Sequence, residues 1–348
     1  NLVNFGVKFP YTGISNYPKG TTNTSSMVDY IHEDDDLFFR TEVTHSQTLN
    51  DSALNGYYGI STFTSSANVR VTQFMRDLGY AAKNTYNRYC FEESSPVSNL
   101  FLNLKYMIER DGRVEENPYF KEVIHFGSVY LLENDVYLPL GFLAESSLAD
   151  LEFIYTNGAA FSFQNKLFTA ATGIDAYVWN TKGHSLTIEP NGTVLTSQNS
   201  NGYTYYKNEQ AQTTMHYRYE FTESGFFCLD INMSARNNFS VWRNNKQLYS
   251  ESVSLPQTLA VSQVEPGDIV EIHITCDAHE TGSITIRGGL LNDRVFRRGY
   301  EILSASTLQL TDFSNTRVAG TINCDRDGLL YTSIPQNGTN WSAYVDGR

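Results

Sequence analysis

The spacing of hydrophobic positions changes near residue 148. Before that point, apolar residues recur at helical spacing between short strand-like runs. One helix face is marked by Val69, Val71, Phe74, Met75 and Leu78 and ends at Gly79, with Ser66 as its expected cap. A second helix begins at Pro96 behind Ser95, and a shorter one is expected over Met27 to His32. Helices alternating with strands predict an α/β domain over residues 1–148.

Beyond Leu148 no helical spacing is evident, and short strands bounded by turn residues follow one another. They are Ser185 to Ile188, Tyr203 to Tyr206, His216 to Phe221, Phe226 to Ile231, Ser240 to Trp242, Ile269 to Thr275 and Ser283 to Arg287. Pro266-Gly267-Asp268 is a turn between two of these regions. This pattern predicts a jelly-roll-like β-sandwich over residues 149–300.

A short internal repeat suggests a third unit. Asn238 to Lys246 reads N-F-S-V-W-R-N-N-K, and Asn340 to Arg348 reads N-W-S-A-Y-V-D-G-R. Because the first copy continues into further strands and the second does not, residues 301–348 are expected to form a second, incomplete β-sandwich unit that packs on the first sandwich or on another copy of the chain. Trp242 and Tyr344 occupy matching positions and are expected in the core. The fold class is therefore α+β multidomain.

Composition and charge exclude some functions. Aromatic residues make up 14% of the 348 residues, and the net charge is −13. Nucleic acid is not an expected partner, because phosphate binding needs a basic stripe. No apolar run approaches the roughly 20 residues of a membrane helix, so we expect a soluble piece of a longer protein. Cys228 and Cys276 fall in strand-like runs and fit small core residues better than a bridge.

The sequence predicts no metal site, no cofactor and no catalytic residue. Asn323 to Gly328 resembles the start of a calcium loop, but its twelfth position is Ile334 where glutamate is needed. His273 and His279 flank Cys276, yet His273 alternates with Ile residues along a strand and should face solvent. Nothing selects a pair of carboxylates for glycoside hydrolysis.

One polar stretch has no evident structural purpose. Asn50 to Ser66 is rich in small, hydroxylated and amide residues around two tyrosines. We expect a ligand site there, formed by Arg40, Asn50, Tyr58 and Ser65. Because the chain is acidic overall, an anionic polymer would be held only locally, with contacts that weaken in salt. The cluster expected for such contacts is Arg294, Arg297 and Arg298.

Several segments, in order and at consistent spacing, resemble the YfhO family of bacterial membrane proteins. They are Phe38-Phe39-Arg40 with Asn50-Asp51, Tyr58 to Ser66, Phe74 to Gly79, Leu104 to Ile108, Tyr130 to Asn134, Leu138 to Phe142, Pro266-Gly267-Asp268, Leu330 to Pro335, Trp341 and Val345-Asp346-Gly347. The resemblance covers nearly the whole chain.

The resemblance implies an extracellular region of a polytopic membrane protein, preceded by many membrane helices and followed by one. Such proteins resemble GT-C glycosyltransferases, which use polyprenyl-phosphate sugars, and some are implicated in glycosylation of lipoteichoic acid or other surface polymers. Their catalytic acid lies in a loop beside the membrane helices, so this region alone should be inactive and should position an acceptor.

The expected partners are a cell-surface glycopolymer or a lipid-linked sugar, and the membrane through flanking helices. Two alternatives remain open from the residues themselves. One is a carbohydrate-binding module that uses Tyr203, Tyr205, Tyr206, Trp242, Trp341 and Tyr344 to stack on sugars. The other is a purely structural cell-surface module.

Overall fold

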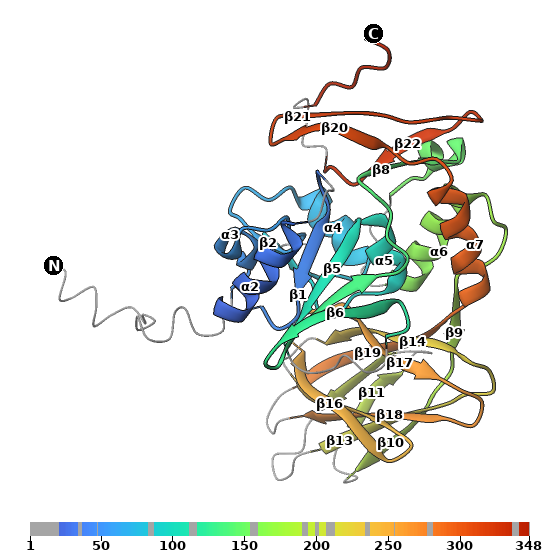
Figure 1. Ribbon diagram of the computed structural model, residues 1–348. Helices are drawn as coiled ribbons and strands as arrows, with labels where there is room; N and C mark the ends of the chain where they lie inside the picture. Colours follow the sequence, from blue (N-terminus) through green and yellow to red (C-terminus); the bar gives the residue numbers. More distant parts are fainter. Residues whose placement is uncertain are drawn as a thin grey trace.

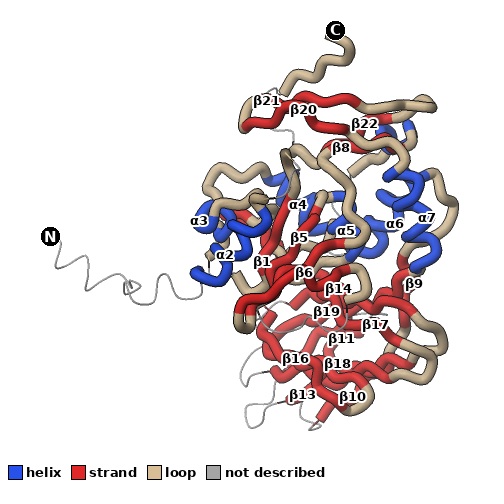
Figure 2. The backbone as a smooth tube through the Cα atoms, viewed as in Figure 1, coloured by secondary structure: helices blue, strands red, loops and turns tan. Residues whose placement is uncertain are grey.

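The computed structural model comprises a helix-covered mixed sheet, a β-sandwich and a short C-terminal β segment (Figures 1 and 2). It describes residues 21–33, 37–46, 48–82, 87–110, 117–153, 159–189, 194–198, 202–206, 213–233, 237–253, 255–276, 281–335 and 341–347. Figure 1 shows the sandwich at one end of the molecule and the C-terminal segment at the other. The expected α+β class is confirmed, while the boundaries at residues 148 and 300 stay predictions.

The N-terminal part is built on a sheet with strand order β1-β5-β7-β6. β1 (Arg40–Val43) runs parallel to β5 (Leu104–Glu109), whereas β7 (Val129–Asn134) lies antiparallel to β5 and to β6 (Phe120–Phe126). A parallel pair needs a long crossover. Here the crossover contains α3 (Asp51–Asn55), β2 (Thr62–Phe63), α4 (Val69–Asp77), β3 (Ala81–Ala82), β4 (Arg88–Cys90) and α5 (Pro96–Phe101).

The helix ends follow local chemistry. Ser95 caps α5 as expected, because its Oγ accepts a hydrogen bond from Ser98 N at 3.2 Å. The expected cap of α4 is wrong: Asn68, not Ser66, accepts from Arg70 N at 2.9 Å. α2 (Thr21–Ile31) also begins earlier than the expected helix and buries its apolar face against β1, β5 and β7.

The β-sandwich has two sheets. One has the order β10-β13-β18-β15-β16, and the other has the order β11-β12-β19-β14-β17 with β9 also paired to β19. The strands are β9 (Trp179–Lys182), β10 (Ser185–Glu189), β11 (Val194–Gln198), β12 (Gly202–Tyr206), β13 (Thr213–Glu220), β14 (Gly225–Met233), β15 (Asn237–Arg243), β16 (Lys246–Val253), β17 (Gln257–Val264), β18 (Ile269–Cys276) and β19 (Thr281–Leu291). Apolar residues from both sheets meet in one core.

Alternation along the strands separates core from surface. Phe239 and Val241 are buried in β15, so Trp242 lies half-buried on the opposite face. The expectation that Trp242 and Tyr344 are core residues is therefore wrong, and Tyr344 is 74% exposed. Cys228 is buried and unpaired, as expected of a small core residue, while the side chain of Cys276 lies outside the described residues.

Two helices beyond residue 148 correct the expectation of an all-β remainder. α6 (Ala160–Thr172) and α7 (Asp293–Ser304) pack together in the core shared with α5 and β8 (Gly141–Ala144). Gly299 allows α7 to approach α6, since a methyl group there would overlap the Phe168 ring. The segment with the three arginines is thus a helix and not a connection.

The sandwich is fused to the N-terminal part through buried polar contacts. Arg76 Nη1 of α4 lies 3.6 Å from Asp230 Oδ1 of β14, and Arg287 Nη1 donates to Asp230 Oδ2 at 3.1 Å. Arg76 and Asp230 are 0% and 1% exposed. Backbone hydrogen bonds add to the junction, including Thr258 N to Gly79 O at 2.7 Å.

The C-terminal segment joins the N-terminal part. β20 (Gln309–Ser314) and β21 (Arg317–Thr321) form a hairpin, and β22 (Leu329–Thr332) pairs antiparallel with β8. Of the two expected packing modes, the one on the first sandwich is therefore wrong, while packing on another copy of the chain stays a prediction. The two copies of the repeat share the conformation of their turn. Asn244 and Asn245 have φ of 49° and 68°, and the matching Asp346 and Gly347 have φ of 50° and 78°. Residues 341–344 form no strand.

Among the described helices, none is long and apolar enough to cross a bilayer.

Candidate binding site

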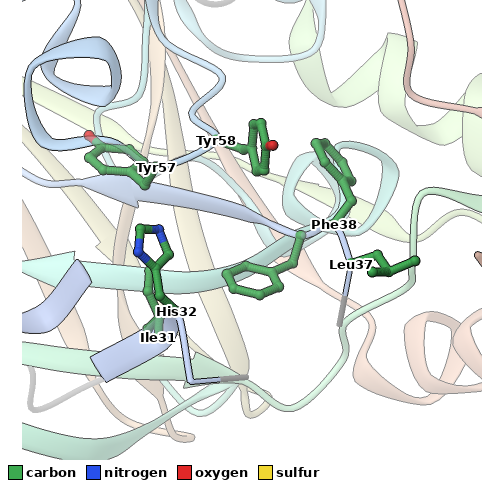
Figure 3. Close-up of a pocket in the computed structure, with 7 residues that line it drawn as sticks. Ile31, His32, Leu37, Phe38, Tyr57 and Tyr58 are labelled. Carbon is green, nitrogen blue, oxygen red and sulfur yellow. The ribbon is translucent and has the colours of Figure 1, made fainter. Parts of the chain in front are cut away.

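An aromatic pocket of about 150 Å³ lies where α2 ends and β1 begins (Figure 3). It is lined by Ile31, His32, Leu37, Phe38, Phe39, Tyr57 and Tyr58. α3 ends at Gly56, whose φ of +80° turns the chain so that the two tyrosines come back over β1. We call this cavity the aromatic pocket.

Phe38 and Tyr58 form one wall of the aromatic pocket, and the Phe313 ring from a distant part of the chain packs against both. The ring centroids of Phe38 and Tyr58 are 5.0 Å apart, and Phe313 of β20 lies 4.5 Å from Phe38 and 5.4 Å from Tyr58. Tyr58 is 48% exposed, whereas Phe38 is 7% exposed. Tyr58 therefore presents an accessible ring on a base of packed aromatics, an arrangement that suits a ring-shaped ligand with an apolar face.

Arg40 holds this wall in place. Its guanidinium carbon lies 5.3 Å from the centre of the Phe38 ring, and Nη1 donates to Leu102 O at 2.8 Å. Nη1 and Nη2 also donate to Ser333 Oγ and Ser333 O, the latter at 3.1 Å. Ser333 Oγ in turn contacts Asn103 Oδ1. Burial lowers the pKa of Arg40. These contacts join β1 to the C-terminal segment.

Glu42 holds the segment that carries Tyr58. Its carboxylate accepts from Ile60 N, from Ser61 N at 2.5 Å and from Ser61 Oγ at 2.9 Å. The same segment is bonded to β1 through Thr41 N and Tyr58 O at 2.9 Å. Burial raises the pKa of the Glu42 carboxyl to about 7, although the hydrogen bonds from Ser61 and Ile60 act in the opposite direction.

The structure brings together two of the four expected ligand-binding residues. Arg40 and Tyr58 both contact Phe38. Asn50 instead bonds the backbone of Phe63, accepting from its N at 2.8 Å and donating to its O at 3.1 Å. Ser65 is exposed in the turn after β2. The assignment of the four as one ligand site stays a prediction.

Sequence reasoning missed several pocket residues. The sequence marks Phe38 only through the family resemblance, and its neighbours His32 and Leu37 belong to no motif. Phe313 lies more than two hundred residues further along the chain, and nothing in its surrounding sequence marks it as a partner of Tyr58. Only the fold brings β20 to this position.

The expected basic cluster is on the exposed face of α7. Arg297 pairs with Asp293 at 3.0 Å and Arg298 with Glu301 at 3.1 Å, while Arg294 is also exposed. The helix therefore neutralises much of this charge locally. Within the described part of the chain, no group of three or more His, Cys, Asp or Glu residues could hold a metal ion.

The fold and the aromatic pocket define a multidomain α+β region that joins a helix-covered sheet to a β-sandwich. The chain matches the family described as "Bacterial membrane protein YfhO" over residues 3–348. It belongs to this family. Among proteins with curated descriptions, none matches the chain.

Parts of the chain are similar to solved carbohydrate-binding modules. A family 35 module from Clostridium thermocellum has 9% identity over 32% of this chain and 96% of that chain, with a TM-score of 0.24. The family 35 module from Cellvibrio japonicus Abf62 has 20% identity over 32% and 83%, with a TM-score of 0.20. TmCBM61, solved with β-1,4-galactotriose, has 10% identity over 30% and 86%, with a TM-score of 0.22. TM-scores this low give no information about a ligand of this chain.

Proposed function

We propose that this chain is an extracellular region of a bacterial membrane protein that positions a glycan of a cell-surface polymer. The polymer, for example lipoteichoic acid, would be the acceptor of a sugar that the membrane part transfers from polyprenyl phosphate. The observation that carries the proposal is the half-exposed Tyr58 ring over the packed Phe38 and Phe313 rings. Sugar rings have apolar C–H faces that stack on such surfaces.

The distribution of exposed apolar residues supports a location beside the membrane. Most of the exposed large apolar side chains lie in the segments around the pocket and at the C-terminal end, namely Tyr30, Leu37, Leu54, Tyr58, Phe63, Val69, Leu330, Trp341, Tyr344 and Val345. Val123 and Phe126 of β6 and Tyr177 before β9 are exposed as well. Among the described side chains between residues 178 and 329, none is of this kind. The end of the molecule that carries the pocket is therefore the one suited to a bilayer or to membrane helices.

A role in positioning fits the residues around the pocket better than a chemical step. Glu42 is covered by the segment that it binds, and Arg40 is engaged with Leu102 and Ser333. We therefore propose no catalytic residue in this region. The transfer itself would take place in the membrane part of the protein.

The test is calorimetry. It measures the binding of this chain to lipoteichoic acid and to the polyglycerol-phosphate chain of that polymer without its sugar. We expect saturable binding that Tyr58→Ala weakens about tenfold, since a stacked ring contributes on the order of 1–2 kcal/mol. Tyr177→Ala is the matched control, because Tyr177 is 70% exposed but lies between α6 and β9, outside the pocket lining. Equal losses in both variants, or no binding by the wild type, would overturn the proposal.

A further inference from the structure

The outer face of one sandwich sheet carries an aromatic row that the aromatic pocket does not use. The row crosses β13, β18 and β15, where His216 lies opposite His273 and His273 lies opposite Ser240. One step further along the strands, Arg218, Glu271 and Trp242 lie opposite one another in the same way. We call these six residues the outer-face row.

These side chains point away from the core. Ile272 and Ile274 flank His273 in β18 and are 0% exposed, whereas the His273 side chain is 24% exposed. Because side chains alternate between the two faces of a strand, His273 and its cross-strand neighbours lie on the solvent side. This confirms the orientation that the sequence predicts for His273.

The three rings form a continuous surface. The centroids of His216 and His273 are 4.2 Å apart, and the Trp242 ring lies 5.5 Å from His273 at an interplanar angle of 24°. Trp242 Nε1 donates to Ser240 Oγ at 2.8 Å, which fixes the indole on the sheet. Since neighbouring strands are about 4.8 Å apart, rings on three strands span roughly 10 Å. That length can support more than one sugar ring.

The charges on this face are paired. Arg218 donates to Glu220 at 3.0 Å and to Glu271 at 3.3 Å. Burial and the neighbouring His216 lower the pKa of His273, which Glu271 partly offsets, and this shift favours the neutral imidazole. The residues that surround the outer-face row on the paired strands have hydroxyl or amide side chains. They are Thr187, Thr214, Thr275, Asn238, Gln247 and Ser250. An occupant of this face should be uncharged and rich in hydroxyl groups.

We propose that the outer-face row binds a neutral glycan chain, with sugar rings stacked on Trp242 and the imidazoles and sugar hydroxyls bonded to Arg218, Glu271 and Ser240. The site is separate from the aromatic pocket and does not depend on its proposed function. An anionic polymer would meet no free positive charge in this row, because Arg218 is paired with Glu220 and Glu271. A neutral polyol with an apolar face matches both the rings and the paired charges.

The test uses linear neutral tetrasaccharides of β-linked glucose, galactose and mannose, titrated into the whole chain. We expect at least one to bind, to change the tryptophan fluorescence and to shift the NMR signals of His216 and His273. Trp242→Ala should weaken binding at least tenfold, whereas Trp341→Ala, the control at an exposed tryptophan outside the row, should leave it unchanged. Binding should also be insensitive to salt.

Two comparisons keep the outcome decisive. Tyr58→Ala should not affect this binding, so a failure of the aromatic pocket and a failure of the outer-face row can be told apart. If Trp242→Ala does not fold, His216→Ala tests the same surface. The proposal is overturned if no tetrasaccharide binds, if Trp242→Ala and His216→Ala both bind like the wild type, or if only a charged polymer binds to this face.

Discussion

Arg40 and Trp242 show where single residues could and could not be placed from sequence. Arg40 was expected to meet a ligand, but its Nη atoms donate to Leu102 and Ser333, a partner 293 residues away that no local pattern reveals. Trp242 was expected in the core because of the repeat. The alternation of Phe239 and Val241, which are buried, with Ser240 and Trp242 was the better guide to its outward position.

At the same scale, Glu42 makes stability depend on pH. Its carboxyl has a folded pKa of about 7 against 4.5 for the unperturbed group. Between these values the unfolded chain has released the proton that the folded chain keeps, so the free energy of unfolding falls as pH rises from about 4.5 to 7 and is level above that. The shift corresponds to about 3 kcal/mol.

Urea unfolding at about pH 5 and pH 8 measures this effect. We expect the free energy of unfolding of Glu42→Gln, which cannot titrate, to fall by about 2.5 kcal/mol less than that of the wild type over this interval. Comparing the two proteins cancels the titration of all other groups. An identical pH dependence in both would show that folding does not raise the pKa of Glu42.

At the scale of elements, strands were easier to predict than helices in the second half of the chain. The sandwich strands have alternating apolar residues and turn signals, and each expected strand is found. α6 was missed although Ala160, Phe163, Leu167 and Ala171 have helical spacing. Its N-cap, Ala159, makes no side-chain hydrogen bond, so the usual start signal is absent.

The contact between α6 and α7 gives a prediction at this scale. Alanine usually favours a helix over glycine by about 1 kcal/mol, but a methyl group at Gly299 would overlap the Phe168 ring, which is fully buried. We expect Gly299→Ala to destabilise the protein by about 1–3 kcal/mol because overpacking outweighs helix propensity. Thermal unfolding measures the difference.

The control for that experiment is Gly183→Ala. A Cβ at Gly183 would have no atom within 4 Å, so this change should leave stability nearly unaltered. A stabilising effect of Gly299→Ala would mean that the two helices separate easily, contrary to their close packing.

At the scale of the whole molecule, the parts are joined by contacts that sequence could not indicate. Burial raises the pKa of Asp230, while Arg76 and Arg287 act against that rise from two different parts of the chain. The pairing of β22 with β8 was equally hidden, because edge strands accept many partners and only the completed fold determines which one is near. The types of the parts were therefore predictable, but their arrangement was not.

That arrangement predicts contact with a bilayer at the end that carries the aromatic pocket. We expect the chain to bind uncharged phosphatidylcholine vesicles weakly in a flotation assay, through its exposed apolar side chains. Leu54 and Phe63 are 37% and 46% exposed, and each should contribute about 1 kcal/mol when covered by lipid. The double change Leu54→Ser and Phe63→Ser should therefore reduce binding at least fivefold.

The control is Tyr177→Ser, which removes a ring that is 70% exposed outside the pocket lining. It should leave vesicle binding unchanged if the bilayer meets only the pocket end. Acidic vesicles should bind less well than uncharged ones, because the chain carries a net charge of −13 and anionic lipids repel it. Stronger binding to acidic vesicles, or an equal loss in the Tyr177 variant, would show that the molecule does not face the membrane in this way.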